Sequence, residues 1–121
     1  MAYFIDIPTI KDDRGSLSVL EKLLPFEIKR VYFIHGAGGS KRGGHRHKES
    51  VQATICVHGS VEIMCDNGKE QVNFLLDSPE KCLMLEPQDW HVMHNFSSDA
   101  VLLVLASNYY DKSDYIYEGY K

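Results

Sequence analysis

Two histidines separated by one residue, His45 and His47, are the residues of this sequence best suited to chemistry. Side chains alternate between the faces of a β-strand, so in an extended segment both imidazoles point to the same side. His91 is a third candidate, in the segment 86–96. Three imidazoles fit two kinds of site: a metal centre, or a pocket that transfers protons near neutral pH.

The metal alternative depends on the residues around the pair. Two histidines followed, after a β-hairpin, by another histidine resemble the signature of the cupins, which are small β-barrels. Cupins that bind metal carry a glutamate a few residues after the pair, and Gln52 takes that place here. A neutral amide is a poor ligand for such cations, which favours proton transfer. Three histidines still suffice for Zn²⁺, Fe²⁺ or Mn²⁺, so a metal-dependent cupin dioxygenase or isomerase using His45, His47 and His91 stays an alternative.

Other polar side chains extend the candidate site. Tyr32 lies in the run 26–34, where it shares a strand face with Arg30, and its hydroxyl is a second group able to transfer a proton. Arg14, Arg30 and Arg42 together suit a diphosphate, because guanidinium groups match phosphate oxygens.

Composition bounds the class of protein. The chain has 121 residues, 44% hydrophobic and 25% charged, with a net charge of −4. This size predicts one domain over residues 1–121. The acidic balance argues against a nucleic-acid partner, and no segment is long and apolar enough to suggest a membrane span. The three cysteines form no CxxC and are expected to be reduced structural thiols, so we expect a cytoplasmic protein.

The elements that must position these residues are β-strands. Short β-branched and aromatic runs separated by turn residues predict an all-β sandwich or barrel such as a jelly roll. Asn67-Gly68 predicts a type I′ hairpin turn, and residues 57–62 a second tight turn. The glycine-rich segment 36–44 is expected to form a flexible lip beside the pocket, and the C-terminal tail to be short and helical or irregular. Strands are expected at 3–7, 16–21, 26–34, 50–59, 61–66, 70–76, 81–86 and 100–107.

Nearly the whole chain resembles the WxcM-like nucleotide-sugar 3,4-ketoisomerases, which act on dTDP-4-oxo-6-deoxyglucose. The resemblance includes "DDRGSL" at 12–17, "RGGHRHK" at 42–48 and "DWHVMHNFSSD" at 89–99. It implies a cupin fold, or double-stranded β-helix, that works without metal or other cofactor. The implied reaction converts the dTDP-4-oxo sugar to the dTDP-3-oxo-6-deoxy sugar through an enediol. The product would lead to 3-amino-3,6-dideoxyhexoses for surface polysaccharides such as lipopolysaccharide O-antigen or S-layer glycan.

The resemblance also implies roles for individual residues. The family's histidine pair falls on His45 and His47, with His45 carrying the proton between carbons and His47 supporting it. The family's tyrosine falls on Tyr32, which would move a proton between the two oxygens. Arg14 and His91 resemble the branch whose product has the galacto configuration at C4. The implied substrate-binding residues are Arg14, Arg30, Arg42, Gln52 and His91.

Family members form homodimers that exchange N-terminal strands, which implies that residues 3–7 pair with a partner chain. Three positions depart from the family pattern: Gly44 replaces an aromatic residue and Arg46 a small one, both flanking the histidine pair, and Glu86 replaces a glycine. Two further alternatives are a dTDP-sugar 3,5-epimerase-like enzyme, which also uses a histidine and a tyrosine in a jelly-roll cavity, and a sugar-binding cupin without activity.

Overall fold

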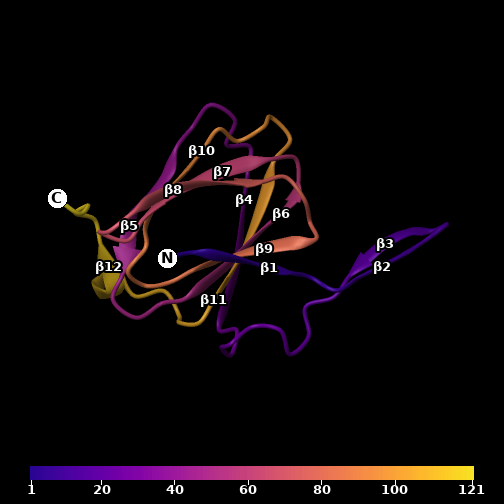
Figure 1. The fold of residues 1–121 in the computed structure, drawn as a ribbon, viewed down its shortest axis with the longest axis horizontal. Helices are drawn as coiled ribbons and strands as arrows, with labels where there is room; N and C mark the ends of the chain where they lie inside the picture. The colour runs from indigo at the N-terminus through magenta and orange to yellow at the C-terminus, as the bar shows by residue number, and fades with distance from the viewer.

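The computed structural model describes residues 1–121 as antiparallel β-strands with a single 3₁₀ turn. Two five-stranded sheets, β1-β9-β6-β11-β4 and β12-β5-β10-β7-β8, enclose the interior, and β2 and β3 form a separate hairpin (Figure 1). This arrangement confirms the all-β jelly-roll prediction. No helix is long and apolar enough to cross a bilayer. The elements are β1 (Tyr3–Asp6), β2 (Thr9–Asp12), β3 (Gly15–Ser18), β4 (Arg30–His35), β5 (Arg42–His47), β6 (Gln52–His58), β7 (Val61–Asp66), β8 (Gln71–Leu76), β9 (Lys81–Leu85), β10 (Trp90–His94), β11 (Val101–Ala106), the 3₁₀ turn Lys112–Asp114, and β12 (Tyr115–Ile116).

The core lies between the two sheets because each strand turns alternate side chains inward. In β7, Val61, Ile63 and Cys65 are buried while the residues between them are partly exposed. Burying each such aliphatic side chain contributes about 1.5–3 kcal/mol, which makes this alternation the main determinant of register. All three cysteines are buried and free, as expected.

The turns match the sequence only in part. Gly59 and Ser60 form the expected tight turn between β6 and β7, with Gly59 at φ 71°. The type I′ prediction for Asn67-Gly68 was wrong, because only Gly68 has a positive φ. A four-residue loop, 67–70, joins β7 to β8 instead. The Asn67 side chain closes it by accepting backbone N–H groups of Lys69 and Glu70, each at 2.9 Å.

The last three residues of the glycine-rich segment 36–44 are part of a strand and not of a flexible loop. Arg42, Gly43 and Gly44 belong to β5, which pairs with β10. Gly43 is required there, because its φ is 90° and a Cβ atom would lie 2.8 Å from the carbonyl oxygen of His91. In the register, Val92 is opposite Gly43 and His91 is opposite His45, so Gly44 is an extra residue in a β-bulge.

The N-terminal hairpin β2–β3 projects away from both sheets (Figure 1). Its large apolar side chains, Ile10 and Leu17, are 62% and 61% exposed. Within the chain, β1 pairs with β9 on one side and forms the edge of its sheet, so its other side has no strand beside it. The hairpin pairs with neither sheet, and Lys11 joins it to Glu80 through an ion pair of 3.2 Å.

The C-terminal tail returns to the barrel as an extended segment after its one 3₁₀ turn. β12 pairs with β5, with Tyr115 opposite His47 and Ile116 opposite Arg46. Further along, the Tyr120 hydroxyl donates a 2.7 Å hydrogen bond to the Gln88 carbonyl. The Arg46 guanidinium lies 4.6 Å from the Tyr120 ring centroid. Arg46 thus contacts the tail and not the cavity.

Candidate active site

A cavity of about 300 Å³ opens beside β4, β5 and β10. Its polar lining brings together residues from three strands of the barrel and from β12 in the tail, which are separated by up to 85 positions in the sequence. Three apolar residues, Phe33, Ile34 and Met93, complete part of the wall. The polar lining residues are Arg30, Tyr32, Arg42, His45, His91 and Tyr115.

The three histidines predicted from the sequence lie together, and two of them, His45 and His91, line this cavity. His45 lies directly opposite His91 across β5 and β10, with ring centroids 5.0 Å apart. The centroids of His45 and His47 are also 5.0 Å apart. His47 and His91 are buried, and His47 lies behind His45, outside the cavity lining.

Backbone and side-chain acceptors orient the two buried rings. Nδ1 of His91 lies 3.1 Å from the Asp89 carbonyl oxygen, and Nδ1 of His47 lies 2.9 Å from Oδ2 of Asp114. Nε2 of each ring is buried and has no hydrogen-bond partner. One ring nitrogen from each of the three histidines lies within 4.8 Å of the others, so this group has the ligand atoms to hold a divalent cation.

Burial sets the protonation of these rings. It lowers the pKa of His45 to about 4, with the nearby His47 adding to the shift, and lowers the pKa of His91 to about 3. The pKa of His47 is also lowered by burial, an effect that Asp114 partly offsets. At neutral pH the rings are therefore uncharged, and His45 presents a neutral imidazole to the cavity.

Tyr32 and Arg30 share a face of β4, as the alternation predicted. The Arg30 guanidinium lies 4.5 Å from the Tyr32 ring centroid. Gln52 donates a hydrogen bond of 3.1 Å from Nε2 to the Tyr32 hydroxyl. Burial raises the pKa of Tyr32, so the phenol stays protonated at neutral pH. Gln52 is only 2% exposed and lies behind Tyr32, outside the cavity lining.

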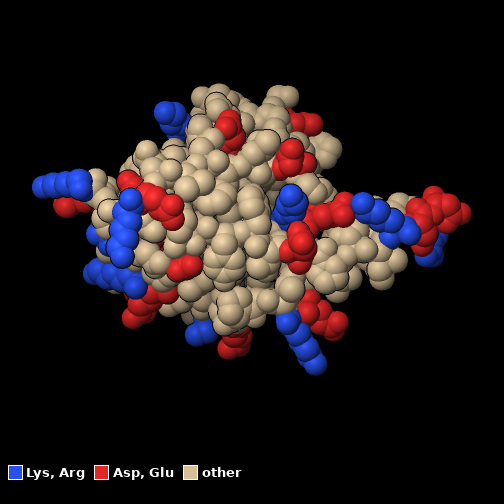
Figure 2. All heavy atoms as spheres, viewed as in Figure 1, with Lys and Arg blue, Asp and Glu red and all other residues tan.

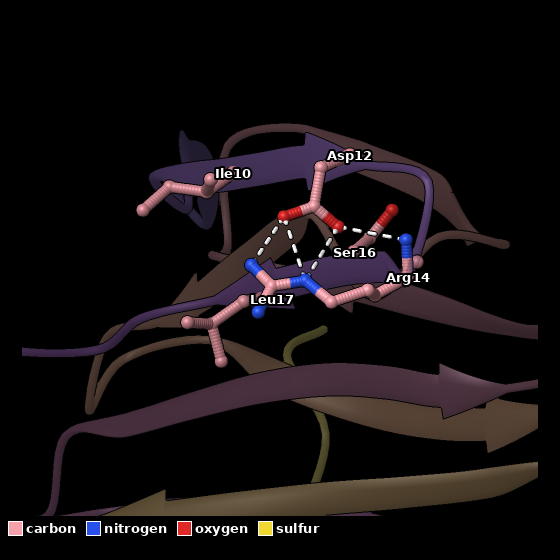
Figure 3. A pocket seen from close by; sticks show the side chains of 6 residues that line it. Ile10, Asp12, Arg14, Ser16 and Leu17 are labelled. Atoms are coloured by element: carbon pink, nitrogen blue, oxygen red, sulfur yellow. Dashed lines mark hydrogen bonds and ion pairs between the residues drawn. The ribbon is translucent and has the colours of Figure 1, made fainter.

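Only two of the three arginines expected around a diphosphate come together. Arg30 and Arg42 line the cavity. Arg14 lies on the projecting hairpin, where Asp12 holds it in an ion pair with Nη2 2.6 Å from Oδ2 (Figure 3). On the face shown in Figure 2, cationic and anionic side chains are interspersed. Arg30 and Arg42 are therefore a local pair of cations in the cavity, and the face shown in Figure 2 is not positively charged as a whole.

Two residues of the site were not among those predicted from the sequence: Asp114 and Tyr115. The Tyr115 ring centroid lies 4.6 Å from that of His45 and 4.7 Å from that of His47. Its hydroxyl is 3.5 Å from Nη1 of Arg30. Both residues reach the site because β12 pairs with β5, and no local pattern predicts that pairing.

Two antiparallel sheets around a cavity lined by histidines, tyrosines and arginines define a cupin-type fold with a polar pocket. The chain belongs to the family described as "WxcM-like, C-terminal", whose model matches residues 2–121.

Named relatives agree with this assignment. The chain is 46% identical over 122 residues to the TDP-4-oxo-6-deoxy-α-D-glucose-3,4-oxoisomerase of Aneurinibacillus thermoaerophilus, covering 97% of this chain and 88% of the relative. It superposes with a TM-score of 0.92 on the TDP-quinovose 3,4-ketoisomerase of Campylobacter jejuni, at 41% identity, covering 97% and 92% of the two chains.

A third comparison is with a relative that was solved in complex with a nucleotide sugar. A mutant 3,4-ketoisomerase from Thermoanaerobacterium thermosaccharolyticum, solved with TDP-4-keto-6-deoxyglucose, superposes with a TM-score of 0.90 at 39% identity, covering 97% and 87% of the two chains. A dTDP-4-dehydrorhamnose 3,5-epimerase from Bacillus anthracis is only 13% identical, with a TM-score of 0.83 over 94% and 76% of the chains, and shows the shared fold alone.

Proposed function

We propose that this protein is a 3,4-ketoisomerase that converts dTDP-4-oxo-6-deoxy-D-glucose to the dTDP-3-oxo-6-deoxy sugar. The observation that carries the proposal is that one cavity presents both a neutral imidazole, His45, and a protonated phenol, Tyr32. The reaction needs one group for transfer between carbons and one for transfer between oxygens. The named relatives support the substrate class.

His45 is the proposed carrier between carbons. The C4 ketone acidifies the C3–H bond, and neutral His45 takes that proton to leave an enediolate. Protonated His45 then delivers the proton to C4. Burial lowers the pKa of His45 to about 4, so its imidazolium gives up the proton to C4 readily. The same side chain serves first as the base and then as the acid.

Tyr32 is the proposed carrier between oxygens. Its phenol donates a proton to the oxygen on C4, which becomes a hydroxyl, and takes up the proton of the hydroxyl on C3, which becomes the ketone. The hydrogen bond from Gln52 fixes the position of the Tyr32 oxygen, so Gln52 acts on the substrate through Tyr32. Over both transfers, two protons move and none is gained or lost.

Substrate binding is assigned to the cations of the cavity. Arg30 and Arg42 would hold the diphosphate or the developing enediolate, since guanidinium groups bind oxyanions strongly in a site of low polarity. His91 forms a wall of the cavity beside His45. With His91 and Arg14 at the two positions that distinguish the branches, we propose the galacto configuration at C4 and use of the product for a 3-amino-3,6-dideoxyhexose of a surface polysaccharide.

We propose a homodimer in which the exchanged element is the hairpin β2–β3. The exposed Ile10 and Leu17 on the hairpin, and Val31 and Phe33 on the outer face of β4, are 56–62% exposed and offer an apolar surface to a second copy. An exchanged hairpin would carry Arg14 to the partner's cavity. The free, buried cysteines favour a reducing compartment, so we place the protein in the cytoplasm.

Product analysis tests the reaction. After incubation with dTDP-4-oxo-6-deoxyglucose, carbon and proton NMR should show the ketone at C3 and an unchanged centre at C5. An inverted C5 bearing the methyl group, with the ketone still at C4, would instead establish the 3,5-epimerase alternative.

A further inference from the structure

The carboxylate of Asp114 contacts four groups next to the histidine pair. Its Oδ2 lies 2.9 Å from Nδ1 of His47 and accepts a 2.6 Å hydrogen bond from the Ser50 hydroxyl. Its Oδ1 accepts the backbone N–H groups of Lys48 and Glu49, at 3.2 and 2.8 Å. The side chains of Asp114 and His47 are 10% and 3% exposed. A carboxylate with this many partners has one fixed position.

The ionisation of Asp114 decides which hydrogen bond it makes. Burial raises the pKa of Asp114, but the hydrogen bonds from Ser50, Glu49 and His47 outweigh burial, and the net pKa lies below its ordinary value. The ionised carboxylate only accepts hydrogen bonds. The shared hydrogen must therefore be on Nδ1 of His47, and Nε2 of the neutral ring carries the lone pair.

That lone pair is buried beside the ring of His45. Nε2 of His47 is buried without a partner, and the His45 ring packs edge-on to the His47 ring, with the planes at 86°. A neutral His47 in this tautomer does not add the repulsion that a charged His47 would exert on the imidazolium formed when His45 takes the substrate proton.

We propose that Asp114 is a positioning residue for the ketoisomerase reaction: it holds His47 as the Nδ1–H tautomer so that a neutral His47 supports His45 as the proton carrier. This inference rests on the proposed function. Asp114 lies in the 3₁₀ turn before β12, and β12 pairs with β5. The C-terminal tail therefore contributes a functional residue to the proposed active site.

The test compares Asp114→Asn with Asp111→Asn. Asp111 is the matched control, because it is a carboxylate in the same turn that accepts hydrogen bonds from Ser113 alone. Asp114→Asn should lower kcat about 100-fold and change KM less than about twofold, whereas Asp111→Asn should leave both near wild type. Equal kcat values for Asp114→Asn and wild type, or an equal loss in both variants, would overturn the proposal.

A measurement on the wild-type protein makes the test independent of how the variants fold and of turnover. Long-range ¹H–¹⁵N correlation spectra of the free protein report the tautomer of each imidazole. His47 should show protonated Nδ1 and unprotonated Nε2 at neutral pH, and Asp114→Asn should lose that preference. Protonated Nε2 on wild-type His47 would contradict the inference, while a wild type that fails to turn over the sugar would contradict only the proposed function.

Discussion

His45 and His91 lie directly opposite each other on β5 and β10, with ring centroids 5.0 Å apart and ring planes at 71°. The pair sits where the register shifts, because Gly44 adds a residue to β5. Bulges of this kind bend a strand and redirect its side chains. Gly44, which replaces the family's aromatic residue, is thus the bulge residue beside His45, and the bulge helps to direct the His45 side chain into the cavity.

Removing the phenol oxygen of Tyr32 should block the proposed proton transfer between the two sugar oxygens. Tyr32→Phe should lower kcat by about 10²–10⁴-fold, because Tyr32 is the proposed general acid–base group for the sugar oxygens. Steady-state rates with the dTDP-4-oxo sugar give the measurement. Tyr109→Phe is the control, since Tyr109 is 72% exposed and outside the cavity. A Tyr32→Phe rate equal to that of the control would remove Tyr32 from the mechanism.

Chelation should leave the reaction intact. Proton transfer by His45 and Tyr32 requires a free lone pair on His45, which a bound cation would occupy. After dialysis against a chelator, we expect full activity and a metal content far below one ion per chain, measured by mass spectrometry. Loss of activity that Zn²⁺, Mn²⁺ or Fe²⁺ restores would instead support the metal-dependent cupin alternative built on His45, His47 and His91.

The local parts of the site were predictable and the distant parts were not. The shared face of His45 and His47, and that of Arg30 and Tyr32, follow from the two-residue period of a strand. Asp114 meets His47 across 67 positions, through a strand pairing that depends on the path of the tail. Gln52 was expected to touch substrate, but its position behind Tyr32 depends on how β6, β11 and β4 align, which is a property of the whole sheet.

Acid should destabilise the fold through the buried histidines. The folded-state pKa of His91 is about 3, below the ordinary value of 6.5, so between these values the unfolded chain binds a proton that the folded chain does not. Stability from this group is therefore complete above pH 6.5 and falls with decreasing pH, by about 1.4 kcal/mol per pH unit. His45 acts in the same direction down to about pH 4.

Urea unfolding between pH 7 and pH 5 measures this slope. His91→Asn should flatten it, whereas His58→Asn should not, because the His58 side chain is 67% exposed. Identical slopes for the two variants would show that His91 is not the buried group that titrates.

Two inactive variants should complement each other if hairpins are exchanged. Arg14 lies outside its own chain's cavity, so in an exchanged dimer it serves the site that contains the partner's His45. A heterodimer of an Arg14→Ala chain and a His45→Asn chain, isolated with two affinity tags, should then contain one intact site and regain activity. A heterodimer as inactive as its parents, or a monomer in light scattering, would contradict the exchanged dimer.

The most direct test of the account is where solvent hydrogen enters the sugar. The ring of His45 lines a cavity that opens to solvent, so in heavy water the proton that it holds at the enediolate stage exchanges before it returns. The 3-oxo product should then carry deuterium at C4, detected by NMR and mass spectrometry. His45→Asn should abolish both turnover and label while leaving dTDP binding, followed by calorimetry, near wild type. Deuterium at C5 with the ketone retained at C4, or undiminished turnover by His45→Asn, would contradict the assignment of His45 as the proton carrier in a 3,4-ketoisomerase.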